Sequence, residues 1–470
     1  MTTQKPRVVI VGGGITGLSA AFYLQKELKK KALDWQVTLL ESSNRLGGKI
    51  QTLVRDGFVM EQGPDSFLER KKSAAELAKD LGLADELVHN RTGQAYILHR
   101  DQLMPIPEGA VMGVPTKLKP FAFTSLVSPA GKVRALADLF LPRSKQPEGE
   151  DQSIGSFFRR RLGDEVVDRI IEPLLSGIYA GDIDTLSLMS TLPQFAEMEK
   201  KYRSLILATK TMRPPQSTAS KPKGVFLTLK KGLHSMVEAI EEQLTQVHVI
   251  KGQPLKRVEK TDQGYLIRLN GGEPLQADAI IMAVPHRVTR QVLGNADFLE
   301  PLHDHPVSVA TVILAFPEDA VHLSKEGTGF VIPRTEPYTI TACTWTHKKW
   351  PHTTPPGKAL LRCYVGRAGD EEIVDKPDDE IVDVVLRDMK RVFPVTGDPE
   401  FTCVTRWKNA MTQFAVGHQA WLKQLYEEME SRYPGVFLVG SSYAGSGIPD
   451  CINQGKKAVR DVLSYLSNGA

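Results

Sequence analysis

The sequence has few cysteines and no pattern that pairs them. None of the four stands in a C-x-x-C pair or a zinc-type spacing, which argues against a disulfide framework and a structural zinc site. We therefore expect free thiols and a reducing compartment. His303 and His305 stand close together, but no further ligand cluster lies nearby, so no metal site is expected. The cysteines are Cys343, Cys363, Cys403 and Cys451.

Strong charge of one sign and long apolar segments are also missing. The net charge is +4 without any lysine-rich or arginine-rich tract, which argues against a nucleic-acid partner. The N-terminal stretch RVVIVGGGITGLSAAFYL contains three consecutive glycines and is followed by QKELKKK instead of a cleavage site, so no signal peptide is predicted. No other stretch approaches the roughly 20 apolar residues of a spanning helix. We expect a cytoplasmic protein in which GAVMGVPTKLKPFAFTSLVSP packs on its own domain, with at most weak peripheral membrane contact.

A strand, a glycine turn and a helix occur at both ends of the chain. RVVIV is typical of a strand, residues 12–14 of a turn, residues 15–31 of a helix and QVTLLE of a second strand, which together predict a βαβ unit. The last forty residues return to a strand, a glycine-rich turn and a helix. The length of 470 residues suits two or three domains, so the two ends are expected to form one nucleotide-binding domain into which the middle is inserted.

The first turn has the spacing of a dinucleotide site, Gly12-x-Gly14-x-x-Gly17. In this pattern the first glycine permits the tight turn, the second lets backbone approach a pyrophosphate, and the third lets helix and strand pack closely. The phosphate then sits at the positive end of the helix. Glu41 ends the second strand, where its carboxylate can accept hydrogen bonds from a ribose hydroxyl and disfavours the 2′-phosphate of NADP. Together these features predict a dinucleotide cofactor.

Two further motifs separate flavin from nicotinamide. In ESSNRLGGKI, Arg45, Gly48 and Lys49 follow Glu41, and the stretch resembles the R-x-G-G-[RK] extension of the monoamine oxidase and protoporphyrinogen oxidase superfamily. The resemblance implies packing on the diphosphate and ribityl of FAD. In GSGIPDC the glycines permit close approach and the proline suits a first helical turn, so the positive helix end can stabilise negative charge at N1 and O2 of a reduced flavin.

The resemblance extends over nearly the whole chain, through GPDSF, EPLLSGIYAGD, LMSTLPQ, TACTWTHKKW and GIPDCINQGKKAV. These stretches resemble the porphyrinogen-oxidising branch, above all its Gram-positive bacterial enzymes, which act as coproporphyrinogen III oxidases. The resemblance implies non-covalent FAD, and the contacts at positions 258 and 407 rest on it alone. The implied contacts are Gly12, Gly13, Gly14, Ile15, Thr16, Gly17, Glu41, Ser42, Arg45, Gly48, Lys49, Gly63, Pro64, Asp65, Ser66, Val258, Trp407, Ser446, Gly447 and Ile448.

The fold implied by the resemblance is α/β. It combines a Rossmann-like FAD-binding domain of the GR2-type, amine-oxidase-like flavoproteins with a mixed α+β substrate domain and an inserted helical domain. The expected boundaries are 1–72, 225–292 and 433–470 for the FAD-binding domain, 73–92, 188–224 and 293–432 for the substrate-binding domain, and 93–187 for the mainly helical insertion.

The implied activity is the oxidation of coproporphyrinogen III to coproporphyrin III in heme synthesis, in three two-electron steps, with oxygen reduced to hydrogen peroxide. Hydride would leave a methylene bridge for flavin N5 and a pyrrole N–H would lose its proton to water, so the protein need mainly orient the macrocycle. No catalytic acid or base is therefore named. The expected partners are the porphyrinogen and oxygen, with ferrochelatase, the next enzyme of heme synthesis, as a candidate.

The cations of GPDSFLERKKS are candidate partners for propionates. Protoporphyrinogen oxidases resemble this stretch but place a substrate-facing arginine where Lys71 falls, and lysine keeps the charge while losing the bidentate geometry. We expect Lys71 to pair with a propionate while Arg70 or Lys72 faces solvent, although three solvated cations at a helix start explain the stretch equally well. Arg70 and Lys71 are thus the charged substrate candidates. The apolar and aromatic candidates, each of which also suits core packing, are Ile178, Phe330 and Tyr364.

Three alternatives stay open. The sequence does not decide between coproporphyrinogen III and protoporphyrinogen IX as substrate. A flavin amine oxidase is the second alternative, and the absence of an aromatic residue after Tyr443 in the C-terminal turn counts against it. A non-catalytic flavin-binding or redox-sensing protein is the third. Cys451 invites comparison with cysteine-linked flavins, but its place at a helix start predicts a buried free thiol.

Overall fold

The computed structural model describes residues 5–91, 93–144, 150–211, 224–294, 296–302 and 305–468, and His303 lies outside these ranges. Within them, no group of three or more His, Cys, Asp or Glu side chains is placed to hold a metal ion. No helix in the described ranges is both long enough and apolar enough to cross a membrane.

A parallel five-stranded sheet carries the N-terminal glycine motif. Its strand order is β10-β2-β1-β14-β20, with every neighbouring pair parallel. β1 lies in the centre because its side chains are buried on both faces, as in parallel sheets that helices cover. The predicted βαβ unit and the α/β class are confirmed. The strands are β1 (Arg7–Val11), β2 (Gln36–Leu40), β10 (Val247–Ile250), β14 (Ala279–Met282) and β20 (Val436–Leu438).

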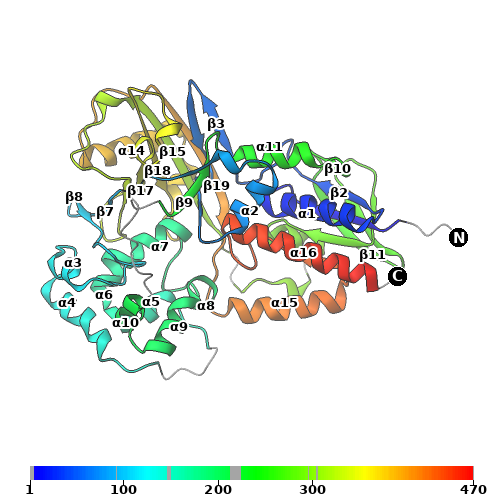
Figure 1. Cartoon of the computed structure of the whole chain (residues 1–470), viewed down its shortest axis with the longest axis horizontal. Helices are drawn as coiled ribbons and strands as arrows, with labels where there is room; N and C mark the ends of the chain where they lie inside the picture. Colours follow the sequence, from blue (N-terminus) through cyan, green and yellow to red (C-terminus); the bar gives the residue numbers. More distant parts are fainter. Residues whose placement is uncertain are drawn as a thin grey trace.

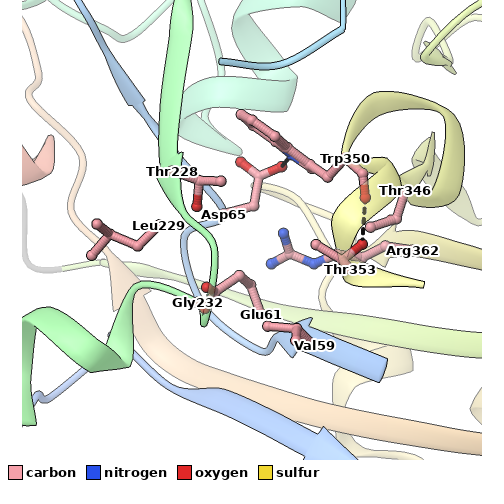
Figure 2. Close-up of a pocket in the computed structure, with 10 residues that line it drawn as sticks. All are labelled: Val59, Glu61, Asp65, Thr228, Leu229, Gly232, Thr346, Trp350, Thr353 and Arg362. Atoms are coloured by element: carbon pink, nitrogen blue, oxygen red, sulfur yellow. Dashed lines mark hydrogen bonds between the residues drawn. The ribbon is translucent and has the colours of Figure 1, made fainter. Parts of the chain in front are cut away.

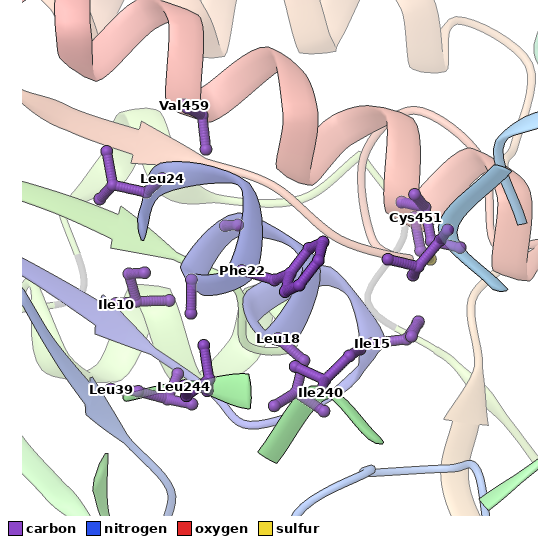
Figure 3. Packing of buried hydrophobic residues seen from close by; sticks show 14 of the residues in the cluster. Ile10, Ile15, Leu18, Phe22, Leu24, Leu39, Ile240, Leu244, Cys451 and Val459 are labelled. Carbon is purple, nitrogen blue, oxygen red and sulfur yellow. The ribbon is translucent and has the colours of Figure 1, made fainter. Parts of the chain in front are cut away.

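Helices from the two ends of the chain lie side by side on this sheet (Figure 1). Leu18 of α1, Ile240 of α11 and Val459 of α16 belong to one buried apolar cluster (Figure 3). α16 approaches α1 closely because Gly455 has no side chain, since a Cβ there would lie 2.6 Å from the carbonyl oxygen of Thr16. The helices of this part are α1 (Ile15–Lys31), α2 (Ser73–Asp80), α11 (His234–Gln243) and α16 (Ile448–Asn468).

A mixed seven-stranded sheet forms a second layer, in the order β19-β15-β18-β17-β16-β7-β8. One face packs on α14 (Asp378–Val392) through apolar side chains such as Leu361 and Val365. The other face carries Arg362 and Tyr364, because side chains alternate along β18. The strands are β7 (Ala95–His99), β8 (Gln102–Pro105), β15 (Val307–Pro317), β16 (Gly329–Val331), β17 (Ile340–Trp345), β18 (Lys358–Val365) and β19 (Phe401–Met411).

Short helices gather below the seven-stranded sheet in the view of Figure 1 and enclose an apolar cluster of their own. The domain boundaries stay a prediction. β7 and β8 belong to the seven-stranded sheet, although both lie after residue 93, where the helical insertion is expected to begin. The helices are α3 (Leu118–Phe123), α4 (Pro129–Leu136), α5 (Ile154–Leu162), α6 (Asp164–Val166), α7 (Glu172–Tyr179), α8 (Leu188–Thr191), α9 (Pro193–Tyr202) and α10 (Leu205–Thr211).

Small sheets and further helices connect the two large sheets. The β3-β4 hairpin leads from the glycine motif to the seven-stranded sheet. The remaining strands and α-helices are β3 (Thr52–Arg55), β4 (Phe58–Glu61), β5 (Phe67–Leu68), β6 (Leu87–His89), β9 (Phe226–Leu229), β11 (Leu255–Thr261), β12 (Gly264–Leu269), β13 (Leu275–Ala277), α12 (His286–Val292), α13 (Thr346–Lys349) and α15 (His418–Arg432).

Candidate functional site

The turn after β1 has the close backbone contacts that its glycines predict. Gly12 adopts a φ of +106°, and a Cβ there would lie 2.5 Å from the carbonyl oxygen of Ala283. A Cβ on Gly17 would lie 1.9 Å from the carbonyl oxygen of Gly12, so only glycine lets α1 begin against the turn. Gly14 instead borders open space, with no atom within 4 Å of where a Cβ would be. The N-terminus of α1 thus opens onto space with no acidic side chain in its first turn, which favours an anionic group.

Glu41 lies beside this turn, at the end of β2. Its Oε2 accepts a hydrogen bond from the Gly13 N–H at 2.7 Å, and its Oε1 accepts from the Ser43 N–H at 2.8 Å. Ser42 next to it is exposed. The carboxylate therefore joins the glycine turn to the strand end, at the position predicted to hold a ribose.

The second glycine motif packs directly on the first. The Gly47 N–H donates to the Gly13 carbonyl at 2.8 Å, and a Cβ on Gly48 would lie 3.1 Å from the Cα of Gly14. Arg45 supports this turn by donating from Nη2 to the Gly48 carbonyl at 3.0 Å. Residues 12–17 and 45–49 are thus brought together as one backbone surface.

Lys49 connects that surface to the seven-stranded sheet. Its side chain is exposed at the surface, although neighbouring elements lower the pKa of its ammonium by desolvation. The ammonium donates to the carbonyl of Ala410, which follows Trp407 on β19. Lys49 therefore lies between the glycine turns and the seven-stranded sheet.

The segment after β4 packs against Lys49 and Trp407. A Cβ on Gly63 would lie 1.8 Å from the Lys49 carbonyl oxygen and 3.4 Å from the Trp407 ring, so this position accepts only glycine. The indole Nε1 of Trp407 donates to the Gln62 carbonyl at 3.0 Å. The structure therefore brings the predicted cofactor contacts Lys49, Gly63 and Trp407 together.

Asp65 is held by cations of α13 and β18. Lys349 Nζ lies 2.9 Å from its Oδ2, and Ser66 Oγ donates to its Oδ1 at 2.6 Å. Burial alone would raise the pKa of this carboxyl, but Lys349 and Arg362 hold it well below its usual range. Asp65 is therefore ionised and joins the segment after β4 to Lys349 at the end of α13.

A small cavity of about 20 Å³ lies behind this segment, with room for about one water. Figure 2 shows the guanidinium of Arg362 directed between Glu61 and Asp65. Arg362 is 5% exposed, and burial raises the pKa of Glu61 to about 7 although the Leu233 N–H donates to it at 2.6 Å. The sequence prediction missed Glu61 and Arg362. An arginine inside the apolar strand ALLRCYV was the available signal, because a charge there requires a buried partner.

The C-terminal turn is fixed by its own helix. Gln454 of α16 accepts from the Gly440 N–H at 3.0 Å and donates to the Gly445 carbonyl at 3.0 Å. Ser446 and Gly447 remain exposed where α16 begins, while Ile448 is buried below them. The turn that leads into the helix is therefore exposed, while the first helical residues are buried.

Cys451 is a buried free thiol, as predicted. Burial raises the pKa of its thiol, which disfavours the nucleophilic thiolate.

Lys71 already has an acidic partner in this chain. Its ammonium lies 2.6 and 2.8 Å from the two carboxylate oxygens of Asp450, the residue before Cys451. Arg70 and Lys72 are exposed, and neither has an acidic partner among the described residues. Burial and the charge of Asp450 raise the pKa of Tyr179 on α7 to about 12, so α7 reaches the same place. The role of Lys71 towards a propionate stays a prediction.

The apolar substrate candidates have different surroundings. Ile178, beside Tyr179 on α7, is 52% exposed, which is unusual for a large apolar side chain. Tyr364 is half-buried, with the Arg362 guanidinium 5.0 Å from its ring centre. Phe330 needs correction, because its ring is 3% exposed and packs in the core against Trp345, leaving no surface for a ligand.

The side chain of Val258 is also buried, in the apolar cluster under β11. Only its backbone is therefore available to a cofactor.

Comparison with known proteins places these features in a family context. Residues 15–463 match the family described as flavin containing amine oxidoreductase. Coproporphyrinogen III oxidase of Bacillus subtilis (strain 168) is 54% identical, over 99% of this chain and 100% of that protein. The enzyme of the same name from Staphylococcus aureus is 43% identical, over 98% of this chain and 99% of that protein. The crystal structure of a provisionally named protoporphyrinogen oxidase from Exiguobacterium sp. 255-15 superimposes with a TM-score of 0.89 at 38% identity, over 99% of both chains.

Proposed function

Because the chain belongs to the flavin containing amine oxidoreductase family, we propose that it is an FAD-dependent oxidase of coproporphyrinogen III. The observation that carries this proposal is the identity of 54% with a coproporphyrinogen III oxidase over essentially the full length of both chains. The overall reaction would convert one coproporphyrinogen III and three O2 into one coproporphyrin III and three H2O2, which balances six electrons and six protons.

The site residues fit FAD. Gly14 and the start of α1 leave open space for the pyrophosphate, and Glu41 stands where an adenosine ribose would lie. The exposed side chain of Lys49 and the exposed turn at Gly447, just before α16, would face the flavin ring. When bound, FAD would accept the hydride that leaves the methylene bridge of the substrate.

Three of the four cysteines support non-covalent binding, and the fourth, Cys403 on β19, is half-buried. The Cys451 thiol, which interacts electrostatically with Lys49, is buried with a raised pKa. Cys343 and Cys363 are buried in the core of the seven-stranded sheet. None of the three offers an exposed thiolate for a covalent link.

The protein's own work is to bind and orient the macrocycle. Ile178 would contact its apolar face, Tyr364 would line the site beside Arg362, and Lys71 with Arg70 would face propionates at its rim. The α16 N-terminus would favour negative charge on the reduced cofactor. Oxygen as acceptor, a cytoplasmic location and delivery of product to ferrochelatase belong to the same proposal, with membrane contact at most weak and peripheral.

A second candidate is protoporphyrinogen IX oxidation, which the name of the Exiguobacterium relative favours. Both proposals are tested with purified protein by acid release of the flavin, followed by turnover of each porphyrinogen measured as porphyrin fluorescence and peroxide. We expect releasable FAD and faster turnover of coproporphyrinogen III. Faster turnover of protoporphyrinogen IX would favour the second candidate, and oxidation of amines alone would contradict both.

A further inference from the structure

Three side chains of the seven-stranded sheet hold the backbone at Gln62 and Gly63. Thr311 Oγ1 on β15 donates to the Gln62 carbonyl at 2.8 Å, and the indole Nε1 of Trp407 on β19 donates to the same oxygen at 3.0 Å. Arg362 on β18 donates from Nη2 to the Gly63 carbonyl. The three donors therefore come from three adjacent strands, and they fix two successive carbonyl groups.

The sheet register explains why these donors share a face. Thr311 is paired with Tyr364 on β18 and with Thr405 on β19, and Arg362 and Trp407 each lie two residues from those partners. Side chains two residues apart point to the same face of a sheet. The face that carries them is the one opposite α14, towards the β3-β4 hairpin.

Fixing the Gln62 carbonyl also fixes the direction of the Gly63 N–H. No cis peptide bond occurs among the described residues, so this carbonyl and this N–H point in opposite directions. The N–H is therefore directed away from the sheet, and no residue in the described part of the chain accepts a hydrogen bond from it. Gly63 is half-buried and abuts the backbone of the exposed Lys49, so this donor is available to a ligand.

Two of the three donors are buried, and the third, Trp407, is half-buried. Thr311 is 4% exposed and Arg362 5% exposed, so neither has room for another orientation. The positive charge of Arg362 lowers the pKa of Asp65 and, against the effect of burial, that of Glu61. A buried guanidinium directed between the carboxyl groups of Glu61 and Asp65 keeps its place, because leaving its charge unpaired in the interior would be strongly unfavourable.

We propose that Thr311, Arg362 and Trp407 are positioning residues that aim the Gly63 N–H at an acceptor atom of the flavin ring. The inference rests on the proposed function in that the chain must bind FAD. A hydrogen-bond donor beside the ring favours the reduced form, which carries more negative charge. The three positioning residues would therefore raise the reduction potential of the bound flavin as well as the affinity for FAD.

Thr311 gives the sharpest test, because it lies behind Gln62 and is not itself a predicted cofactor contact. Thr311→Val removes the hydroxyl at nearly constant shape. We expect the dissociation constant of FAD, measured by flavin fluorescence on dilution of the holoprotein, to rise about three- to tenfold. We also expect the midpoint potential of the flavin to fall by up to about 30 mV, which corresponds to a tenfold loss of affinity for reduced FAD relative to oxidised FAD.

A matched control is Thr209→Val on α10, which removes a buried hydroxyl that donates to the Leu205 carbonyl at 2.8 Å. We expect its FAD affinity and potential to equal those of the unsubstituted protein. Should Thr311→Val fail to fold, Thr311→Ser and Thr311→Ala form a second pair that differs by the hydroxyl alone. The serine variant is then expected to retain the potential and the alanine variant to lose it.

The outcomes separate this inference from the proposed function. An unsubstituted protein that neither contains nor binds FAD would overturn the proposed function. If that protein binds FAD and Thr311→Val leaves its potential unchanged, the aiming of the Gly63 N–H is wrong, whether or not the affinity changes.

Discussion

Glu61 is expected to keep a proton near neutral pH in the folded protein. Its carboxyl receives hydrogen bonds from the Leu233 N–H at 2.6 Å and from Thr52 Oγ1 at 2.9 Å, and it faces the cavity beside Arg362. Burial nevertheless raises its pKa to about 7, because the desolvation of the charged form exceeds these stabilising contacts. The perturbation we propose is Glu61→Gln, which keeps the shape and an acceptor for the Leu233 N–H.

The magnitude and sign follow from linkage. A rise from the ordinary 4.5 to about 7 corresponds to about 3 kcal/mol. Below pH 4.5 the group is protonated in both states and costs nothing. Between pH 4.5 and 7 the unfolded chain releases the proton while the folded protein keeps it, so the free energy of unfolding falls by up to about 3 kcal/mol as pH rises. Above pH 7 this contribution no longer changes.

Asp65 acts in the opposite direction. Its pKa is lowered in the folded protein, so its contribution to stability is present above the ordinary carboxyl pKa and is lost as pH falls below it. The two carboxyls therefore affect different pH windows. Glu172, whose pKa burial also raises, and His347, His352 and His418, whose pKa values burial lowers, contribute near the window of Glu61, so Glu61 is read from the difference between the unsubstituted protein and Glu61→Gln.

Infrared titration of the holoprotein measures this directly, because a protonated carboxyl has its own carbonyl band. We expect a band that disappears with a midpoint near pH 7, is absent in Glu61→Gln and is present in a control variant of the exposed Glu242, Glu242→Gln. Denaturant unfolding of Glu61→Gln should show a flatter pH profile between pH 5 and 7. A midpoint near pH 4.5, or an unchanged profile in the variant, would refute the reasoning.

Three further predictions concern the cofactor and the substrate. Glu41→Ala should raise the dissociation constant of FAD tenfold or more without unfolding the protein, since a buried hydrogen bond to a charged group contributes about 1.5–3 kcal/mol; full flavin occupancy with unchanged affinity would contradict the ribose assignment. Gly447→Val should fold, because the nearest atom to the new Cβ, at 2.9 Å, is a carboxylate oxygen of Asp450, and the end of this side chain can move aside. Reduction of the flavin by substrate, followed by stopped-flow absorbance, should nevertheless be slower. A normal flavin spectrum and turnover in that variant would place the turn far from the ring. Lys71→Ala should raise KM severalfold for coproporphyrinogen III and less for protoporphyrinogen IX, with Lys72→Ala as the unaffected control, and equal effects on both substrates would disprove the propionate role.

The parts of the fold that local patterns specify could be predicted from the sequence. The strand, glycine turn and helix at residues 7–40 follow from hydrophobic spacing and from backbone positions that only glycine tolerates. Cys451 was correctly predicted as a buried free thiol, because its position at the start of α16 is a local property.

Long-range pairing could not be predicted in the same way. Thr311 and Trp407 meet Gln62 from positions about 250 and 345 residues away, and the antiparallel register that aligns them leaves no local pattern. The same limit explains Phe330, since neighbouring residues of a short strand point to opposite faces and the sequence does not say which face is the core. For Arg362 the sequence contained a signal, a charged residue within an apolar strand, but it did not identify the partners of that charge.

The Lys71–Asp450 pair limits how much one cation can contribute to substrate choice. Its side chains are 42% and 25% exposed, so the pair is worth at most about 1 kcal/mol. A propionate that takes Lys71 from Asp450 exchanges one half-exposed ion pair for another, and the net gain is smaller than the pair itself. A more than severalfold preference for coproporphyrinogen III, with four propionates, over protoporphyrinogen IX, with two, therefore requires a second cation. Arg70 is exposed and has no acidic partner in the described ranges, so it can bind a propionate without first breaking an ion pair. The proposed selectivity consequently depends on Arg70 and Lys71 together.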